Sequence, residues 1–139
     1  MKTAIFAAIL ILVFVSASPA QDKSPKIVTE EFFRLLMQNK MPEAYNQLFV
    51  GSPVPKLRPE ETDIIKEHTQ STLADYGKIL GYDLIREEKF GGSVLRLVYL
   101  LKSEVVPTIW EFFFYKPNSE WYLLGVTFSE DADALVAMQ

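Results

Sequence analysis

The sequence contains no cysteine, a single histidine and no cluster of basic residues among its 139 positions. Without cysteine there is neither a disulfide nor a lipid-carrying cysteine behind a leader, so the fold must be stabilised by its core. One histidine without cysteine also argues against a zinc or copper site. A net charge of −4 without a basic block argues against nucleic-acid binding, which needs clustered Lys and Arg. We therefore expect no metal, no cofactor and no nucleic-acid partner.

The first twenty residues have the pattern of an export leader. Lys2 precedes an apolar run from Ala4 to Val15, and small residues follow as far as Ala20. This pattern is typical of a secretory signal peptide, with cleavage after Ala17 or Ala20. The alternative is an uncleaved membrane anchor, but the run is shorter than the ~20 apolar residues that cross a bilayer. We expect a protein that is secreted or exported to the bacterial periplasm, with no stable membrane anchor after cleavage.

Helical periodicity fills the first half of the chain beyond a short linker at residues 21–24. Ser24 and Pro25 form a helix start, because a serine oxygen caps free amides and proline fits the first helical position. A stretch with three prolines, "GSPVPKLRP", predicts a loop between two later helices. The predicted elements are a helix over 25–38, a second over 42–50, the loop over 51–59, and a third helix that begins near Pro59 and ends before Gly81.

From residue 80 onward the apolar residues alternate with a period of two, which is typical of strands. Three N-terminal helices followed by a four-strand antiparallel meander form an α+β fold, with the helices packed on one face of a curved sheet. This domain extends to residue 128 and a tail follows over 129–139. The predicted strands cover about 80–89, 94–102, 108–116 and 121–128, separated by "GG", "SEVVP" and "PNSE".

The turns predict which side chains share a face of the sheet, because directly opposed residues of antiparallel strands do so. A two-residue Gly-Gly turn places Glu87 opposite Arg96, and a loop over 116–120 places Phe114 opposite Tyr122. The helix-covered face then includes Leu84, Tyr99, Trp110, Phe112, Phe114, Tyr122 and Leu124. The outer face includes Glu87, Arg96, Glu111, Phe113, Tyr115, Trp121 and Leu123.

The outer face raises the question of what covers its aromatic side chains. Phe113, Tyr115 and Trp121 would form an exposed apolar patch, and such patches mark interfaces. We expect this patch to bind a second copy of the chain, forming a homodimer, or another protein. Glu87, Arg96 and Glu111 would form cross-strand ion pairs and not a catalytic carboxylate pair, because the arginine holds both acids ionised.

The phrases "EEFFRLLMQNKMPEAYNQLF" and "WEFFFYKPNSEWYLLGVTF", together with the element order, resemble the nuclear transport factor two-like superfamily over about residues 25–128. The resemblance implies a cone-shaped, cystatin-like α+β fold and a pocket between the helices and the inner sheet face. It also implies a frequent homodimer through the sheet. Enzymes of this group place an Asp, His or Tyr set inside the cone. The matching positions here are His68 and Asp75, with Tyr76, Tyr99, Trp110 and Phe112 around the pocket.

Two functions follow from these expectations. The first, which we favour, is a noncatalytic exported domain that binds a partner protein, which could be a second copy, or a small apolar ligand. The second is a cofactor-free isomerase or dehydratase with its site in the cone. The second requires His68 or Asp75 to point into a cavity. Asp75 lies seven residues after His68, too far along a helix for a direct hydrogen bond at ~1.5 Å per residue.

Overall fold

The computed structural model describes residues 23–131 together with 133 and 137. The expected leader, residues 1–20, lies outside the described residues, as does part of the linker and of the tail. Among the described residues, the four helices that pack on the sheet come before the first strand. The helices are α1 (Pro25–Met37), α2 (Met41–Leu48), α3 (Val54–Leu57) and α4 (Pro59–Tyr76).

Helix α1 begins where the sequence predicts. The Ser24 hydroxyl accepts a hydrogen bond from the Ile27 amide at 3.4 Å, and Pro25 occupies the first turn. The buried face of α1 carries Phe32 and Phe33, both 0% exposed. This helix therefore supplies two large aromatic rings to the centre of the core.

The prolines of residues 51–59 do not exclude a helix, and the prediction of a loop throughout this stretch is wrong. Helix α3 is a single turn, in which the amides of Lys56 and Leu57 donate to the Pro53 carbonyl at 3.2 and 3.1 Å. The Arg58 amide donates to the Val54 carbonyl at 2.7 Å. Proline is compatible with this turn because the first residues of a helix need no donor.

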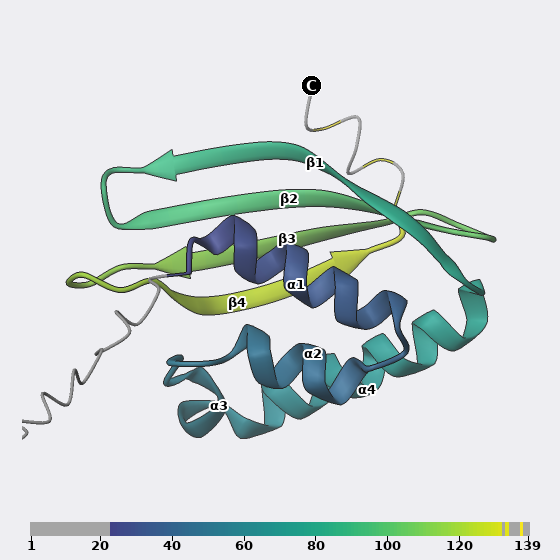
Figure 1. Cartoon of the computed structure of the whole chain (residues 1–139), viewed down its shortest axis with the longest axis horizontal. Coiled ribbons are helices and arrows are strands. Elements are labelled where there is room, and N and C mark those ends of the chain that lie inside the picture. Colours follow the sequence, from purple (N-terminus) through teal and green to yellow (C-terminus); the bar gives the residue numbers. More distant parts are fainter. Residues whose placement is uncertain (1–22, 132, 134–136, 138–139) are drawn as a thin grey trace, which may run out of the picture.

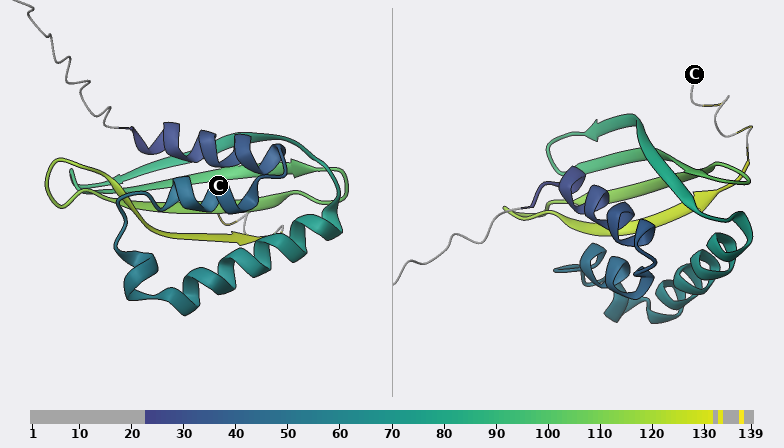
Figure 2. Two further views of the ribbon diagram at one scale, coloured as in Figure 1. Left: turned by 60° about the horizontal axis from the view of Figure 1, so that its bottom comes forward. Right: turned by 45° about the vertical axis from the view of Figure 1, so that its right-hand side comes forward.

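The strands form one antiparallel sheet in the order β1-β2-β3-β4. In Figures 1 and 2 the helices lie on one side of this sheet, and α4 runs past its β4 edge. The predicted α+β class, with N-terminal helices on one face of a four-strand meander, is confirmed. The strands are β1 (Ile79–Phe90), β2 (Val94–Ser103), β3 (Thr108–Tyr115) and β4 (Tyr122–Ser129).

The first hairpin has a longer turn than predicted. Phe90 lies opposite Val94, so the turn contains the three residues "GGS" instead of two. Gly91 takes a φ of 61°, a left-handed conformation that favours glycine. A bulge further along β1 compensates for the extra residue, so Leu84 lies opposite Tyr99 as predicted.

The longer turn changes the partners of the charged residues. Arg96 lies opposite Glu88, and the predicted pair of Arg96 with Glu87 is wrong. Glu87 lies opposite Leu97, which is fully buried on the helix side. A shift of one residue moves a strand side chain to the other face of the sheet, so Glu87 belongs to the inner side.

The last hairpin shows the same kind of shift. Tyr115 lies opposite Tyr122 and Phe114 opposite Leu123, so the connecting loop has one residue more than predicted. The predicted positions of Trp121 on the outer face and Tyr122 on the inner face are therefore wrong. An irregularity between Phe113 and Phe114 in the pairing absorbs the extra residue. Beyond it, the inward positions in β4 agree with the prediction. The displaced side chains are Trp121 and Leu123, which face the helices, and Tyr122 and Leu124, which face outward.

Candidate functional site

The space expected to hold a pocket is filled by aromatic side chains. Tyr99, Trp110 and Phe112 are each at most 1% exposed. The Phe32 ring lies 5.6 Å from that of Trp110, and the Phe33 ring lies 5.1 Å from that of Tyr99, measured between ring centroids. Because the two phenylalanines of α1 occupy the centre of the layer, this end of the molecule is closed core.

Two buried tyrosine hydroxyls in this core are paired with threonine hydroxyls. Tyr99 and Thr29 lie 2.7 Å apart, and Tyr45 and Thr69 lie 2.6 Å apart. Burial raises the pKa of both tyrosines above its usual value of 10.0, only partly offset by the threonine hydrogen bonds. These tyrosines are neutral at physiological pH and connect α1 to β2 and α2 to α4.

The other candidate residues lie on α4, outside the buried aromatic cluster. His68 and Asp75 are both exposed. The His68 ring stacks on Phe128 with 4.7 Å between centroids. Tyr76 donates a hydrogen bond to the carboxylate of Glu130. The structure thus gives no contact between His68 and Asp75, and the Phe128 ring lies between His68 and the buried Trp110.

A hollow of about 350 Å³ lies at the opposite end of the layer between helices and sheet. Trp121 forms one wall, and the Lys116 ammonium lies over its ring at 5.0 Å from the centroid. The floor is apolar, since Leu48, Phe114 and Leu123 are each at most 2% exposed. We call this site the Trp121 hollow. Its lining residues are Lys23, Val28, Glu31, Gln47, Leu48, Val50, Gly51, Phe114, Glu120, Trp121, Tyr122 and Leu123.

The connection after α2 is fixed against β4 beside this hollow. The Ser52 hydroxyl donates to the Leu123 carbonyl at 2.6 Å and accepts from the Val54 amide at 3.2 Å. Gly51 has a φ of 77°, and a side chain built there would meet no atom within 4 Å. The strand therefore holds the loop in place without closing the hollow.

The charges at the hollow lie at its mouth. Glu31 forms a salt bridge with Arg34 of 2.5 Å. The hydrogen bond from Arg34 lowers the pKa of Glu31, which is therefore ionised at neutral pH. The other charged lining residues, Lys23 and Glu120, are opposite in sign and exposed. Counting Arg34, these four charges sum to zero.

A second hollow, of about 360 Å³, lies where α1 and α4 end. Its lining mixes the apolar Leu36 and Leu73 with the polar Asn39 and Lys78. None of the four predicted pocket residues lines either hollow. Sequence reasoning missed the Trp121 hollow because the predicted register assigned Trp121 and Leu123 to the outer face.

The outer sheet face carries a row of apolar side chains at the turn end of the sheet. The pairing aligns Phe90, Val94, Tyr115 and Tyr122 across the four strands. Phe90 is 52% exposed, and the rings of Tyr115 and Tyr122 contact each other at 5.7 Å. We call these four residues the outer row. The predicted outer positions of Phe113 and Tyr115 agree with this geometry.

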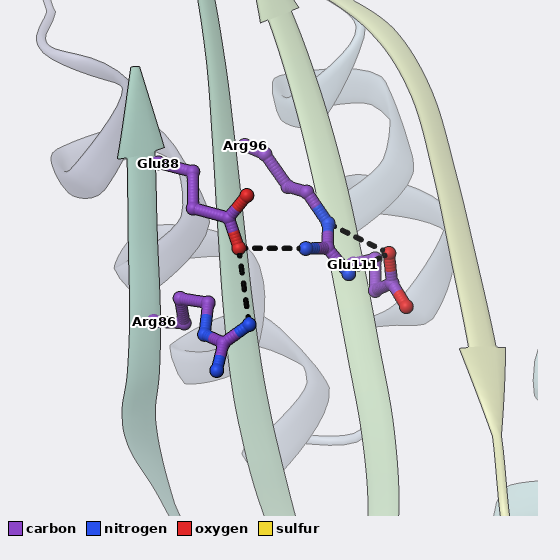
Figure 3. Close-up of polar contacts among 4 residues, drawn as sticks. All are labelled: Arg86, Glu88, Arg96 and Glu111. Atoms are coloured by element: carbon purple, nitrogen blue, oxygen red, sulfur yellow. Dashed lines mark hydrogen bonds and ion pairs between the residues drawn. The ribbon is translucent and has the colours of Figure 1, made fainter. Parts of the chain in front are cut away.

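Next to the outer row lies a set of four alternating charges, shown in Figure 3. Arg96 contacts Glu88 at 2.8 Å and Glu111 at 2.9 Å, and Arg86 contacts Glu88 at 3.4 Å. The Arg96 guanidinium also lies 5.9 Å from the ring centroid of Phe113. We call Arg86, Glu88, Arg96 and Glu111 the charge ladder.

The predicted ladder had Glu87 in place of Glu88, and that assignment is wrong. Glu87 pairs with Lys26 of α1 at 2.6 Å on the helix side of the sheet. The predicted alternation of carboxylate and guanidinium groups is present, with Glu88 in the position predicted for Glu87. The arginine contacts both carboxylates, so the arrangement suits cross-strand ion pairing.

Searches among protein-family models, curated proteins and solved structures gave no match to this chain. Within the described residues, no three His, Asp or Glu side chains are grouped so that they could hold a metal ion. None of the described helices has the length and apolar character needed to cross a membrane.

Proposed function

We propose that this protein is a noncatalytic binding domain that associates with a second copy of itself through the outer sheet face. The observation that carries the proposal is the outer row, which leaves aromatic surface in water beside the charge ladder. Apolar surface gains about 25 cal/mol for each Å² removed from water, so covering this row is favourable. A small exposed row next to paired charges is typical of the mixed composition of protein interfaces.

The ladder indicates a second copy as the partner because it is self-complementary. Consider a two-fold axis that is parallel to the strands and lies between the two sheets, over the middle of the ladder. It places each residue of the second copy at the same position along the strands, but it reverses the order of the residues across the strands. Glu88 then faces Arg96 of the second copy, and Arg86 faces its Glu111. The same rotation brings the outer row onto the outer row of the second copy. Two sheets packed face to face with nearly aligned strands are a common arrangement.

A variant in which each of the four ladder charges has the opposite sign, called the reversed ladder, tests this arrangement. The variant Arg86→Glu, Glu88→Arg, Arg96→Glu, Glu111→Arg keeps every intramolecular pair and remains complementary to itself. Against the wild type, however, it places like charges opposite each other. We expect both chains to form homodimers, and mixed dimers to fall below about a tenth of the population, as measured by native mass spectrometry of isotopically labelled mixtures.

The control is a mixture of two isotopic forms of the wild type, which should give about half mixed dimers if subunits exchange freely. A monomer at ~100 µM would show that the partner is not a second copy. The same random mixing with the reversed ladder would show that the chains associate through another surface.

Export and family membership belong to the same proposal. The leader pattern of residues 1–20 supports export to the bacterial periplasm or secretion. The helices on one face of a four-strand meander support the resemblance to the nuclear transport factor two-like superfamily. Fractionation of the host, with mass determination of the released chain, tests export and locates the cleavage site.

The alternative, a cofactor-free isomerase or dehydratase, has less support from the geometry. His68 lies exposed against Phe128, and Asp75 is exposed on the same helix. A general base needs a partner that orients it and a cavity that holds the substrate. Neither residue lines the Trp121 hollow or the second hollow.

A further inference from the structure

We infer that the Trp121 hollow is a second, independent binding site, which takes a small uncharged molecule with a compact aromatic or alicyclic body. Its volume of about 350 Å³ is within the range of small-molecule sites. Apart from Tyr122, which also belongs to the outer row, its lining residues lie outside the proposed interface, so the hollow stays accessible in a dimer formed through the outer face. The site therefore does not depend on the proposed self-association.

The size and chemistry of the lining define the body of the ligand. Phe114 and Leu123 form a buried floor, and Trp121 forms an aromatic wall that is only partly buried. Aromatic walls favour flat rings, which contact them through stacked or edge-on arrangements. Gln47 is a neutral polar residue of the lining, and its amide can donate to or accept from one hydroxyl or carbonyl group.

The charges exclude an ionised ligand. An ion placed on the floor would be desolvated against Leu48, Phe114 and Leu123, with no buried group of opposite charge beside it in the lining. At the mouth, Glu31 is paired with Arg34, while Lys23 and Glu120 have opposite signs. Lys116 lies over the Trp121 ring but does not line the hollow. Because these charges lie at the mouth or outside the lining, none of them offsets the desolvation of an ion on the floor.

Three matched probes test both the site and the ligand class: naphthol, naphthoate and naphthylmethylammonium. They share one bicyclic body, and the charge of the last two lies too near the rings to remain in water. Binding is followed by the indole N–H signals in NMR spectra, where Trp110 and Trp121 give separate resonances. We expect naphthol to shift the Trp121 signal and leave Trp110 unchanged, with both ions binding at least ~10-fold more weakly.

Two exposed valines give a matched pair of variants. Val50 lines the hollow and is 68% exposed, whereas Val105 lies in the turn between β2 and β3 and is 65% exposed. Val50→Trp should obstruct the hollow and weaken naphthol binding at least ~10-fold, while Val105→Trp should not change it. An ion that binds as tightly as naphthol overturns the uncharged class. An unshifted Trp121 signal with all three probes at ~1 mM overturns the site, as does equal binding by the two variants.

Discussion

The two tryptophans mark the two ends of the layer between the helices and the sheet, and their surroundings differ. Trp110 is 0% exposed, stacks on Phe128 at 4.4 Å, and donates its indole N–H to Thr108 at 2.8 Å. Trp121 is only partly buried and forms the wall of a hollow of about 350 Å³. The same residue type is thus a core element at one end and accessible surface at the other.

The difference arises from what the helices supply at each end. At the closed end, α1 presents Phe32 and Phe33, which fill the space above the sheet. At the open end, it presents Val28, and α2 and the following loop contribute Leu48 and Val50. Smaller side chains leave space that the neighbouring backbone does not close, because Ser52 holds the loop against β4. The space filled by Phe32 and Phe33 is therefore suited to stability, and the hollow walled by Trp121 is suited to binding.

The largest effect should come from removing a ring at the closed end. Phe33→Ala should lower the free energy of unfolding by about 3–5 kcal/mol, because it leaves a cavity in a close-packed aromatic cluster. Trp121→Ala should cost less than half as much, since part of that side chain is already in water. Chemical denaturation of both variants measures the contrast. Equal losses would show that the two ends are packed alike.

A smaller effect should come from a buried hydroxyl pair. Thr69→Val leaves the Tyr45 hydroxyl without its partner at 2.6 Å, and should cost about 1–3 kcal/mol in the free energy of unfolding. Tyr45→Phe combined with Thr69→Val removes both polar groups and should recover part of that loss. A double-mutant cycle by chemical denaturation measures the coupling. Additive losses would show that the hydrogen bond does not connect α2 to α4.

The buried hydroxyls of Tyr45 and Tyr99 make the free energy of unfolding depend on pH in the alkaline range. Burial raises the pKa of Tyr45 and Tyr99 in the folded state above the usual 10.0. A raised folded-state pKa gives stability that is complete below the unfolded pKa and is lost as pH rises toward and through the folded value. We expect stability to fall as pH rises above about 10, and to fall less steeply in Tyr99→Phe. An identical slope in the variant would contradict the assignment.

The smallest effect should come from the ladder. Glu88→Gln removes the acid that contacts both Arg86 and Arg96, and should cost about 0.2–1 kcal/mol in monomer stability because these groups are partly solvated. Its effect on self-association should be larger than on folding, because the partner arginine is then left without its acid. Sedimentation equilibrium and denaturation of the same variant separate the two quantities. If Glu88→Gln changes only the free energy of unfolding and not self-association, the ladder is not part of the interface.

The sequence predicts the fold class and most of the closed end, because alternation and helix signals are local. Ser24, Pro25 and the period-two run through Trp110 and Phe112 lead directly to the observed elements. The open end could not be predicted, since one extra residue in each of two turns moves Glu87 and Trp121 to the faces opposite those expected. Such register choices depend on bulges and tertiary contacts that leave no local pattern.

The most direct test of the central claim is the mass of the intact protein. Native mass spectrometry of the chain at ~100 µM, purified gently from its exporting host, reports association and bound small molecules together. We predict a dimer, and the reversed ladder should form one as well. A wild-type protein that remains monomeric at this concentration would contradict the proposal that the outer face binds a second copy.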